Sequence, residues 1–291
     1  MITCRIESKN GHFKPFDIGG NDFAVIAGPC SLESYDLGIQ IGEALLDICG
    51  ELGFKYIFKA SFDKANRTSI KSWRGPGIEK GLEQLSRIGK TLQVPTLTDI
   101  HETWQAEMAA EAVDMLQIPA FLCRQTDLLI AAAKTQKPVN IKKAQFLAPE
   151  DMLSALNKCR DSGGSACLCE RGSIMGYHQL VVDMRGLAEM RAFGCPVIFD
   201  TTHSVQKPGG DGTSSGGDRR FVLPLSRAAV AIGIDGIFFE THPTPSEAKC
   251  DGPNMVPLKR AKEFLVQIKK IDSLVRKDIG FTELDFMEGM L

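Results

Sequence analysis

The sequence predicts an α/β fold and, within that class, a (β/α)8 TIM barrel with a short N-terminal hairpin. Two observations lead to this prediction. Short apolar runs alternate with longer amphipathic stretches, as strands buried on both faces alternate with the helices that cover them. The alternation occurs eight times within about 250 residues, which matches the size of such a barrel. We therefore expect residues 1–291 to form a single barrel domain.

Each expected strand is a short apolar run. The strands are Phe23–Ala27, Tyr56–Lys59, Pro95–Thr98, Met115–Ile118, Val139–Lys142, Ala166–Cys169, Val197–Asp200 and Gly236–Glu240. The expected helices are Asp36–Leu52, Gly77–Leu92, Thr103–Ala112, Thr126–Lys134, Pro149–Cys159, Leu180–Ala192, Arg219–Ile232 and Leu258–Val275. Before them, Ile2–Ile18 contains an Asn10-Gly11 turn and is expected to form a hairpin that closes the bottom of the barrel. A doubly wound sheet is the structural alternative, although no glycine-rich dinucleotide fingerprint follows the first expected strand.

The composition is that of a soluble globular protein, with 43% hydrophobic and 24% charged residues. A net charge of -2 gives no reason to expect nucleic-acid or membrane binding. The nine cysteines are odd in number and irregularly spaced, which argues against a secreted disulfide scaffold. There is no signal peptide pattern at the N-terminus and no run of the ~18 apolar residues that a membrane helix needs. We expect a cytoplasmic protein with free thiols.

Polar residues stand at the end of every expected strand, where the chemistry of such barrels takes place. They are Cys30, Lys59, Asp99, Gln117, Lys142, Arg171, Asp200 with His203, and Glu240. A single one of them has an ordinary explanation as a solvated loop residue. Their presence at all eight strand ends predicts a functional site.

Six cations belong to these segments: Lys59, Lys64, Arg67, Arg124, Lys142 and Arg171. Arginine offers a planar fork to phosphate and lysine a point charge. Their convergence in a near-neutral protein indicates a substrate with more than one anionic group. The alternative is a set of unrelated surface charges.

A second group, Cys30, His203, Glu240 and Asp251, comes from strands one, seven and eight and the loop after strand eight. Closure of the barrel makes these strands neighbours. Thiolate, imidazole and carboxylates form a mixed site for a divalent transition metal. On residue type alone, Cys30 could equally be a packed thiol and His203 a hydrogen-bonded loop residue.

The segment Pro208–Gly217, PGGDGTSSGG, follows the seventh expected strand. Its glycines and serines predict a mobile loop, which we expect to close over bound substrates.

Several segments resemble one known family. They are AGPCSLES, FKASFDKANRTS, RGPG, QIPAFLCRQTDL, NIKKAQF, CERG, FDTTHSVQ and ETHPTPSEAKCDGP. In this order, from about Phe23 to Lys259, they resemble the 3-deoxy-D-manno-octulosonate 8-phosphate synthases, also called 2-dehydro-3-deoxyphosphooctonate aldolases. The resemblance implies condensation of phosphoenolpyruvate, D-arabinose 5-phosphate and water with release of phosphate, for lipopolysaccharide precursor synthesis. It also implies a homotetrameric barrel.

The resemblance is to the metal-dependent group of that family. Members of this group carry Cys at the position of Cys30, where the others carry Asn, and they match His203, Glu240 and Asp251. The implied cofactor is a divalent transition metal, which can be Zn, Fe, Mn or Co, with no organic cofactor.

Site roles follow from the resemblance residue by residue. Phosphoenolpyruvate is expected to meet Lys59, Lys64, Lys142 and Arg171, near Gln117 and the Ala120 backbone, with Asp99 also in the substrate-binding set. The sugar phosphate is expected at Asn66, Arg67 and Ser69, with Arg124 coming from a neighbouring subunit. Lys64, His203 and Asp251 are the candidate catalytic residues. Thr68 stands where the family has Ser, and both supply a hydroxyl.

Two alternative functions remain open at this point. A 3-deoxy-arabino-heptulosonate 7-phosphate synthase shares the barrel and the metal ligands and uses erythrose 4-phosphate. Its loop after strand two resembles KPRTSP, whereas this chain has KANRTS, in which Asn66 favours the longer sugar. A noncatalytic barrel that binds sugar phosphates is the other alternative, and turnover by the purified protein distinguishes it.

Overall fold

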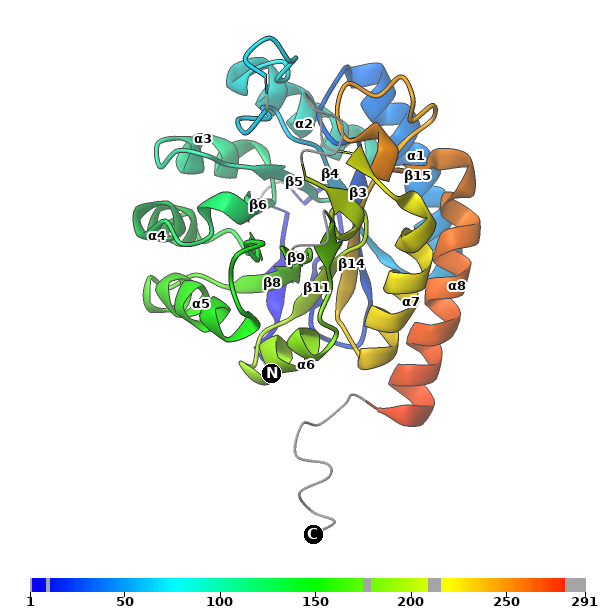
Figure 1. Ribbon diagram of the computed structural model, residues 1–291. Helices are drawn as coiled ribbons and strands as arrows, with labels where there is room; N and C mark the ends of the chain where they lie inside the picture. The colour runs from blue at the N-terminus through cyan, green and yellow to red at the C-terminus, as the bar shows by residue number, and fades with distance from the viewer. Residues whose placement is uncertain (1, 9–10, 68, 175–178, 209–215, 281–291) are drawn as a thin grey trace.

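The computed structural model describes residues 2–8, 11–67, 69–174, 179–208 and 216–280. Eight parallel strands form its centre, and helices surround them (Figure 1). The barrel strands are β3 Ala24–Gly28, β4 Lys55–Lys59, β5 Thr96–Asp99, β6 Met115–Ile118, β7 Val139–Lys142, β8 Ala166–Glu170, β11 Val197–Asp200 and β14 Gly236–His242. They pair in chain order, and pairing of β11 with β14 closes the sheet. The predicted barrel is confirmed, as are all eight strands to within two residues.

The helices that follow the strands form the outer layer. They are α1 Tyr35–Leu52, α2 Ile78–Leu92, α3 Gln105–Ala112, α4 Thr126–Lys134, α5 Met152–Asp161, α6 Arg185–Ala192, α7 Val222–Ile232 and α8 Ala261–Leu274. Short helical turns lead into three of them: Pro149–Asp151, Arg219–Phe221 and Leu258–Arg260. Each helix begins and ends within about five residues of its predicted bounds.

The predicted start of the sixth helix at Leu180 was wrong. Leu180–Val181 is strand β10, which pairs antiparallel with β9, Ser173–Ile174. The helix begins only at Arg185, where the Asp183 carboxylate accepts a hydrogen bond from the Arg185 backbone N–H. Leu180 is buried, so its apolar character reflects packing of this small ribbon rather than a helix face.

A hairpin closes the N-terminal end of the barrel, as predicted. Strand β1, Cys4–Ile6, pairs antiparallel with β2, Phe16–Ile18. The inward side chains Cys4, Ile6, Phe16 and Ile18 pack against the apolar residues inside the barrel, which include Ile26, Met115 and Phe238. Of the predicted turn, Asn10 lies outside the described residues.

Successive side chains along each strand point alternately toward the helices and toward the barrel axis, so they belong to two different apolar cores. In β4, Tyr56 and Phe58 face the helices, whereas Ile57 faces the barrel axis. Lys59 is therefore the next inward position, at the C-terminal end of the strand. At the end of β3, a Cβ on Gly28 would lie 2.1 Å from the carbonyl oxygen of Lys59, so only glycine fits beside that strand end.

The glycine-rich segment is described only at its edges. Strand β12, Gln206–Lys207, pairs with β13, Gly216–Gly217, while residues 209–215 lie outside the described residues. The predicted mobile loop is therefore not tested. All nine cysteines are free and buried. Among the described helices, none combines the length and apolar character needed to span a membrane.

Candidate active site and metal centre

A ring of polar side chains lies at the C-terminal end of the barrel, at or near the ends of seven of its eight strands. Its members are Lys59, Asp99, Gln117, Lys142, Arg171, Asp200 and Glu240, all of them buried. Charged groups are buried at tolerable cost only when they are paired or hydrogen-bonded. Most of these groups are paired with one another, and a few of their atoms have no partner among the described residues.

Lys59 and Glu240 form a fully buried ion pair. The Lys59 ammonium donates to Oε1 of Glu240 at 2.9 Å and to the Cys30 carbonyl oxygen at 2.8 Å. Both side chains are 1% exposed. Burial alone would raise the pKa of Glu240, but the nearby cations, Lys59 first among them, outweigh it and hold that pKa at about 2. Both partners are therefore charged at neutral pH, and the contacts of Lys59 join the end of β4 to β14 and to the segment after β3.

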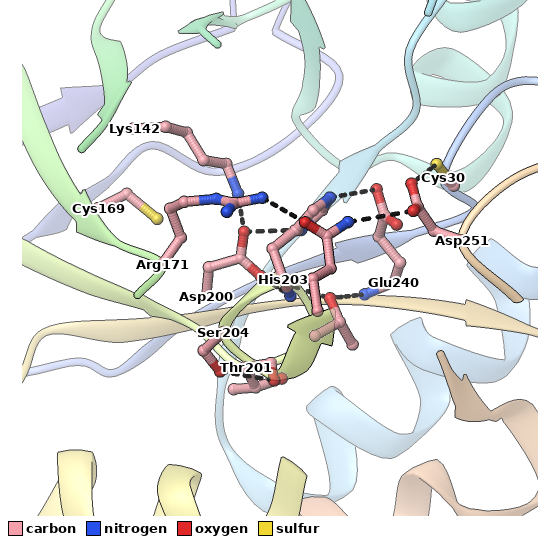
Figure 2. A network of polar contacts seen from close by, with 12 residues as sticks. Cys30, Lys142, Cys169, Arg171, Asp200, Thr201, His203, Ser204, Glu240 and Asp251 are labelled. Atoms are coloured by element: carbon pink, nitrogen blue, oxygen red, sulfur yellow. Dashed lines mark hydrogen bonds and ion pairs between the residues drawn. The ribbon is translucent and has the colours of Figure 1, made fainter. Parts of the chain in front are cut away.

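Asp200 orients His203. Its carboxylate accepts a hydrogen bond from the His203 backbone N–H at 2.9 Å, lies 2.8 Å from Nδ1 of the same residue, and contacts the Lys142 ammonium (Figure 2). Burial opposes ionisation of Asp200, but His203 and Lys142 together hold its pKa well below the usual range. The other ring nitrogen of His203, Nε2, faces away from Asp200 and lies 3.8 Å from Oε1 of Glu240. A carboxylate behind one ring nitrogen and a free second nitrogen is the arrangement of a metal-binding histidine.

The Arg171 guanidinium is buried with one donor group unused. Nη2 donates to Oε1 of Gln206 at 2.6 Å, and Nε2 of Gln206 donates in turn to Oδ1 of Asp251 at 3.1 Å. Nη1 is buried and has no hydrogen-bond partner among the described residues. Burial lowers the pKa of Arg171 from its usual value of 12.5, and the charges of Asp200 and Asp251 act against that shift. An unpaired N–H of a buried guanidinium is suited to bind an anion.

Asp99 and Gln117 form the opposite side of the ring. The Asp99 carboxylate accepts hydrogen bonds from the Ser61 hydroxyl and the Gln117 amide, and Oε1 of Gln117 accepts one from Asn140 at 2.8 Å. Burial opposes ionisation of Asp99, yet Lys59 and Lys64 keep its pKa well below the usual range. The carboxylate thus carries a charge that balances the lysines beside it.

Two sets of potential metal ligands meet at Asp251. The first is His203, Glu240 and Asp251, and the second is Cys30, Cys250 and Asp251; within each set the donor atoms lie within 4.8 Å of one another. Sγ of Cys30 lies 3.2 Å from Oδ2 of Asp251. Oε2 of Glu240 is buried without a hydrogen-bond partner among the described residues. An orphaned carboxylate oxygen beside a thiol, an imidazole and a second carboxylate fits a divalent transition metal.

Two adjoining cavities open onto these groups. The larger, of about 780 Å³, is lined by residues that include Asn66, Arg67, Arg171, Cys250 and Asp251. The smaller, of about 270 Å³, reaches down to Lys59, Asp99, Gln117 and Lys142. Lys64, Asn66, Phe121, Gln145, Arg171 and His203 line both. Together the cavities offer room for two small phosphorylated molecules side by side.

Most of the residues singled out from the sequence line these cavities or touch their walls. Cys30, Lys59, Lys64, Asn66, Arg67, Asp99, Gln117, Ala120, Lys142, Arg171, His203, Glu240 and Asp251 are in this group. Two others are not. Arg124 is exposed and borders neither cavity, and Ser69 likewise borders neither within this chain.

Sequence reasoning missed Gln206 and Cys250 as members of the site. Gln206 links Arg171 to Asp251, and Cys250 lies beside Cys30. Cys250 directly precedes the predicted ligand Asp251, which was a usable signal. Gln206, three residues after His203, begins the short strand β12, and nothing in the sequence indicated that its side chain reaches Arg171.

Comparison with known proteins agrees with this geometry. A family model described as the DAHP synthetase I family matches residues 5–277. A protein of Desulfotalea psychrophila is 57% identical over 259 residues, covering 89% of this chain and 92% of its own. A protein of Bordetella bronchiseptica is 53% identical over 280 residues, covering 94% and 98%. Both are named 2-dehydro-3-deoxyphosphooctonate aldolase. The chain therefore belongs to the DAHP synthetase I family and, within it, to the 2-dehydro-3-deoxyphosphooctonate aldolases.

Proposed function

We propose that the protein condenses phosphoenolpyruvate, D-arabinose 5-phosphate and water to 3-deoxy-D-manno-octulosonate 8-phosphate and inorganic phosphate, a step in lipopolysaccharide precursor synthesis. The names of its relatives support this assignment. The structural observation that carries it is the set of buried cations Lys59, Lys142 and Arg171 at the cavity floor. Nη1 of Arg171 has no hydrogen-bond partner within the described part of the chain. A substrate that bears both a phosphate and a carboxylate matches such a set.

Phosphoenolpyruvate belongs in the smaller cavity. There Lys59, Lys64, Lys142 and Arg171 would share its two anionic groups, and Gln117, Asp99 and the Ala120 backbone would form the neighbouring wall. The Lys142 ammonium also lies 3.3 Å from the centroid of the Phe238 ring, which fixes its position from below. Because Asp99 and Asp200 are ionised, they would repel a misplaced anion and so define its orientation.

Arabinose 5-phosphate belongs in the larger cavity, with its aldehyde toward the smaller one. Asn66 and Arg67 line this space, and Nη2 of Arg67 donates to the Lys249 carbonyl oxygen at 3.2 Å, which holds the guanidinium near the cavity. Ser69 is included on the strength of the resemblance. Arg124 is assigned to the site of a neighbouring subunit in a homotetramer, which agrees with its exposure in the single chain. The unpaired thiols support a reducing, cytoplasmic location.

In the reaction, carbon three of phosphoenolpyruvate bonds to the sugar aldehyde carbon, water adds at carbon two, and phosphate leaves with its carbon–oxygen bond broken. Holding two mutually repelling substrates in line is worth up to ~7–11 kcal/mol of the barrier. Burial alone would lower the pKa of Lys64, but the nearby thiols and Glu240 raise it well above its usual value. Lys64 is therefore an ammonium at neutral pH and the candidate donor to the aldehyde oxygen. Asp251 is the candidate to accept a proton from water, and His203, whose ring nitrogens face Asp200 and the metal site, would act by holding the metal.

Cys30, His203, Glu240 and Asp251 would hold the divalent metal, whether Zn, Fe, Mn or Co. When bound, the metal would polarise an oxygen of the sugar or orient the attacking water. Asp200 would keep the His203 ring oriented for this purpose, as its 2.8 Å contact with Nδ1 indicates.

The alternative is the heptulosonate reaction with erythrose 4-phosphate, after which the DAHP synthetase I family is named. One assay distinguishes the two. Phosphate release from phosphoenolpyruvate is measured with each aldose phosphate over a range of concentrations. We expect a kcat/KM at least about a hundredfold higher with arabinose 5-phosphate, corresponding to about 3 kcal/mol of discrimination. Equal or reversed specificity would refute the octulosonate assignment, and no release with either sugar would favour the noncatalytic alternative.

A further inference from the structure

A second thiol lies at the metal site. Cys250, in the loop after β14, is 5% exposed, and Cys30 is 1% exposed. With Met255 they form a small buried cluster that is separate from the two large apolar cores. The octulosonate family resemblance accounts for Cys30 as a ligand but gives no role to Cys250.

The donor atoms of Cys30, Cys250 and Asp251 have the spacing of a coordination shell. All three lie within 4.8 Å of one another, and Sγ of Cys30 is 3.2 Å from Oδ2 of Asp251. Zn–S bonds are about 2.3 Å long, so two sulfur atoms bound to one ion lie no more than about 4.6 Å apart. Only small side-chain movements are therefore needed for both thiols to contact one ion together with Asp251.

The loop is built so that Cys250 and Asp251 both face Cys30. Asp251 has a φ of 51°, a left-handed conformation that is strained for a non-glycine residue. The next residue, Gly252, passes so close to Pro245 that a Cβ would lie 2.2 Å from its carbonyl oxygen. The Gly252 carbonyl accepts a hydrogen bond from Arg219 Nη2 at 2.6 Å. These contacts fix the strained turn and hence the direction of both side chains.

The sulfur of Cys250 also has an outer partner. The Ser31 hydroxyl lies 3.2 Å from Sγ of Cys250. Groups that hydrogen-bond to ligand atoms orient metal ligands and tune their affinity. Asp251 belongs to both ligand sets, so the two thiols lie next to the carboxylate that His203 and Glu240 also approach.

We propose that Cys250 is a second thiolate ligand, so that the site offers two sulfur donors and selects soft or borderline metals such as Zn²⁺ and Co²⁺ over Mn²⁺. Thiolates favour Zn²⁺ and its neighbours, whereas Mn²⁺ prefers oxygen donors. Each additional sulfur shifts that preference further. This inference rests on the metal-binding part of the proposed function, but it is tested on metal binding and not on turnover.

The test uses the full-length protein loaded with one equivalent of Co²⁺. Sulfur-to-cobalt charge-transfer absorption reports the number of thiolates bound. We compare wild type with Cys250→Ser, Cys30→Ser and, as a control, Cys49→Ala, whose thiol is buried in helix α1 away from the site. Cys250→Ser and Cys30→Ser should each retain about half of the wild-type absorption per bound Co²⁺, because one of two sulfur ligands is lost. The control should match wild type.

A second readout is the ratio of Mn²⁺ to Zn²⁺ dissociation constants from competition titrations. We expect Cys250→Ser to reduce this ratio by about tenfold or more. Circular dichroism confirms that each variant is folded, and Cys250→Ala replaces Cys250→Ser if the latter is not. Unchanged absorption and an unchanged ratio in the Cys250 variant, with complete loss of absorption in Cys30→Ser, would overturn the second thiolate and leave the metal site intact. Absence of Co²⁺ binding in wild type would overturn both.

Discussion

Replacing Arg171 with Ala is expected to weaken the use of phosphoenolpyruvate by a large factor. The guanidinium is 5% exposed, and its Nη1 has no partner among the described residues, so an anion bound there would be desolvated. Losing one partner of a buried, hydrogen-bonded charge pair costs on the order of 2–5 kcal/mol. At about 1.4 kcal/mol per factor of ten, that cost corresponds to a fall in kcat/KM of about thirtyfold to several thousandfold.

The assay is phosphate release at saturating sugar with varied phosphoenolpyruvate, repeated with the roles of the two substrates exchanged. Arg160→Ala is the matched control. Its guanidinium is also partly buried but donates to the carbonyl oxygens of Phe193 and Gly194, each at 3.0 Å, and borders neither site cavity. This control should lower stability while leaving kcat/KM within about twofold of wild type. Folded Arg171→Ala protein with unchanged kinetics would refute the assignment of Arg171 to the substrate site.

Four further changes test separate parts of the structure. Lys59→Met should lower the free energy of unfolding by about 3–5 kcal/mol in urea titrations, since Glu240 would be left buried and unpaired; a loss below about 1 kcal/mol would contradict the pairing. The depressed pKa of Glu240 contributes about 3 kcal/mol to the free energy of unfolding. This contribution is fully present above the unfolded pKa of 4.5 and is lost as the pH falls through about 2, so Glu240→Gln should flatten the pH dependence of stability in that window. An unchanged slope would argue against the depressed pKa. Ile6→Ala, in the N-terminal hairpin, should lower the free energy of unfolding by about 2–5 kcal/mol, whereas Ile2→Ala should have little effect because Ile2 is 59% exposed. Equal effects of the two substitutions would mean that the hairpin does not contribute to the core. Cys30→Asn should bind metal weakly and keep some chelator-resistant turnover, and wild-type metal affinity in this variant would exclude the thiolate as a ligand.

The barrel was predictable because buried parallel strands have a strong local signature. Runs such as Met115–Ile118 and Val139–Lys142 are short, apolar and flanked by polar segments, and they became strands with those bounds. The ring of functional side chains followed from the same pattern. Once alternation places Ile57 inside the barrel, Lys59 must also face inward at the strand end.

What the sequence did not predict depends on tertiary contacts. Leu180 looked like a helix residue because it is apolar, but its pairing with Ile174 makes it part of a small ribbon. Cys250 lies in a loop and Gln206 in the two-residue strand β12, and neither segment is long enough to show a periodicity that indicates the direction of a side chain. Arg124 was predicted to act from a neighbouring subunit, and this remains a prediction.

Formation of 3-deoxy-D-manno-octulosonate 8-phosphate from phosphoenolpyruvate and arabinose 5-phosphate is the most direct test of the proposed function. The purified protein is incubated with both substrates, before and after exhaustive chelation, and the product is identified by mass and quantified against released phosphate. We expect one product molecule per phosphate, loss of both after chelation, and recovery when a divalent transition metal is added back. Absence of the octulosonate product from metal-replete protein would contradict the account.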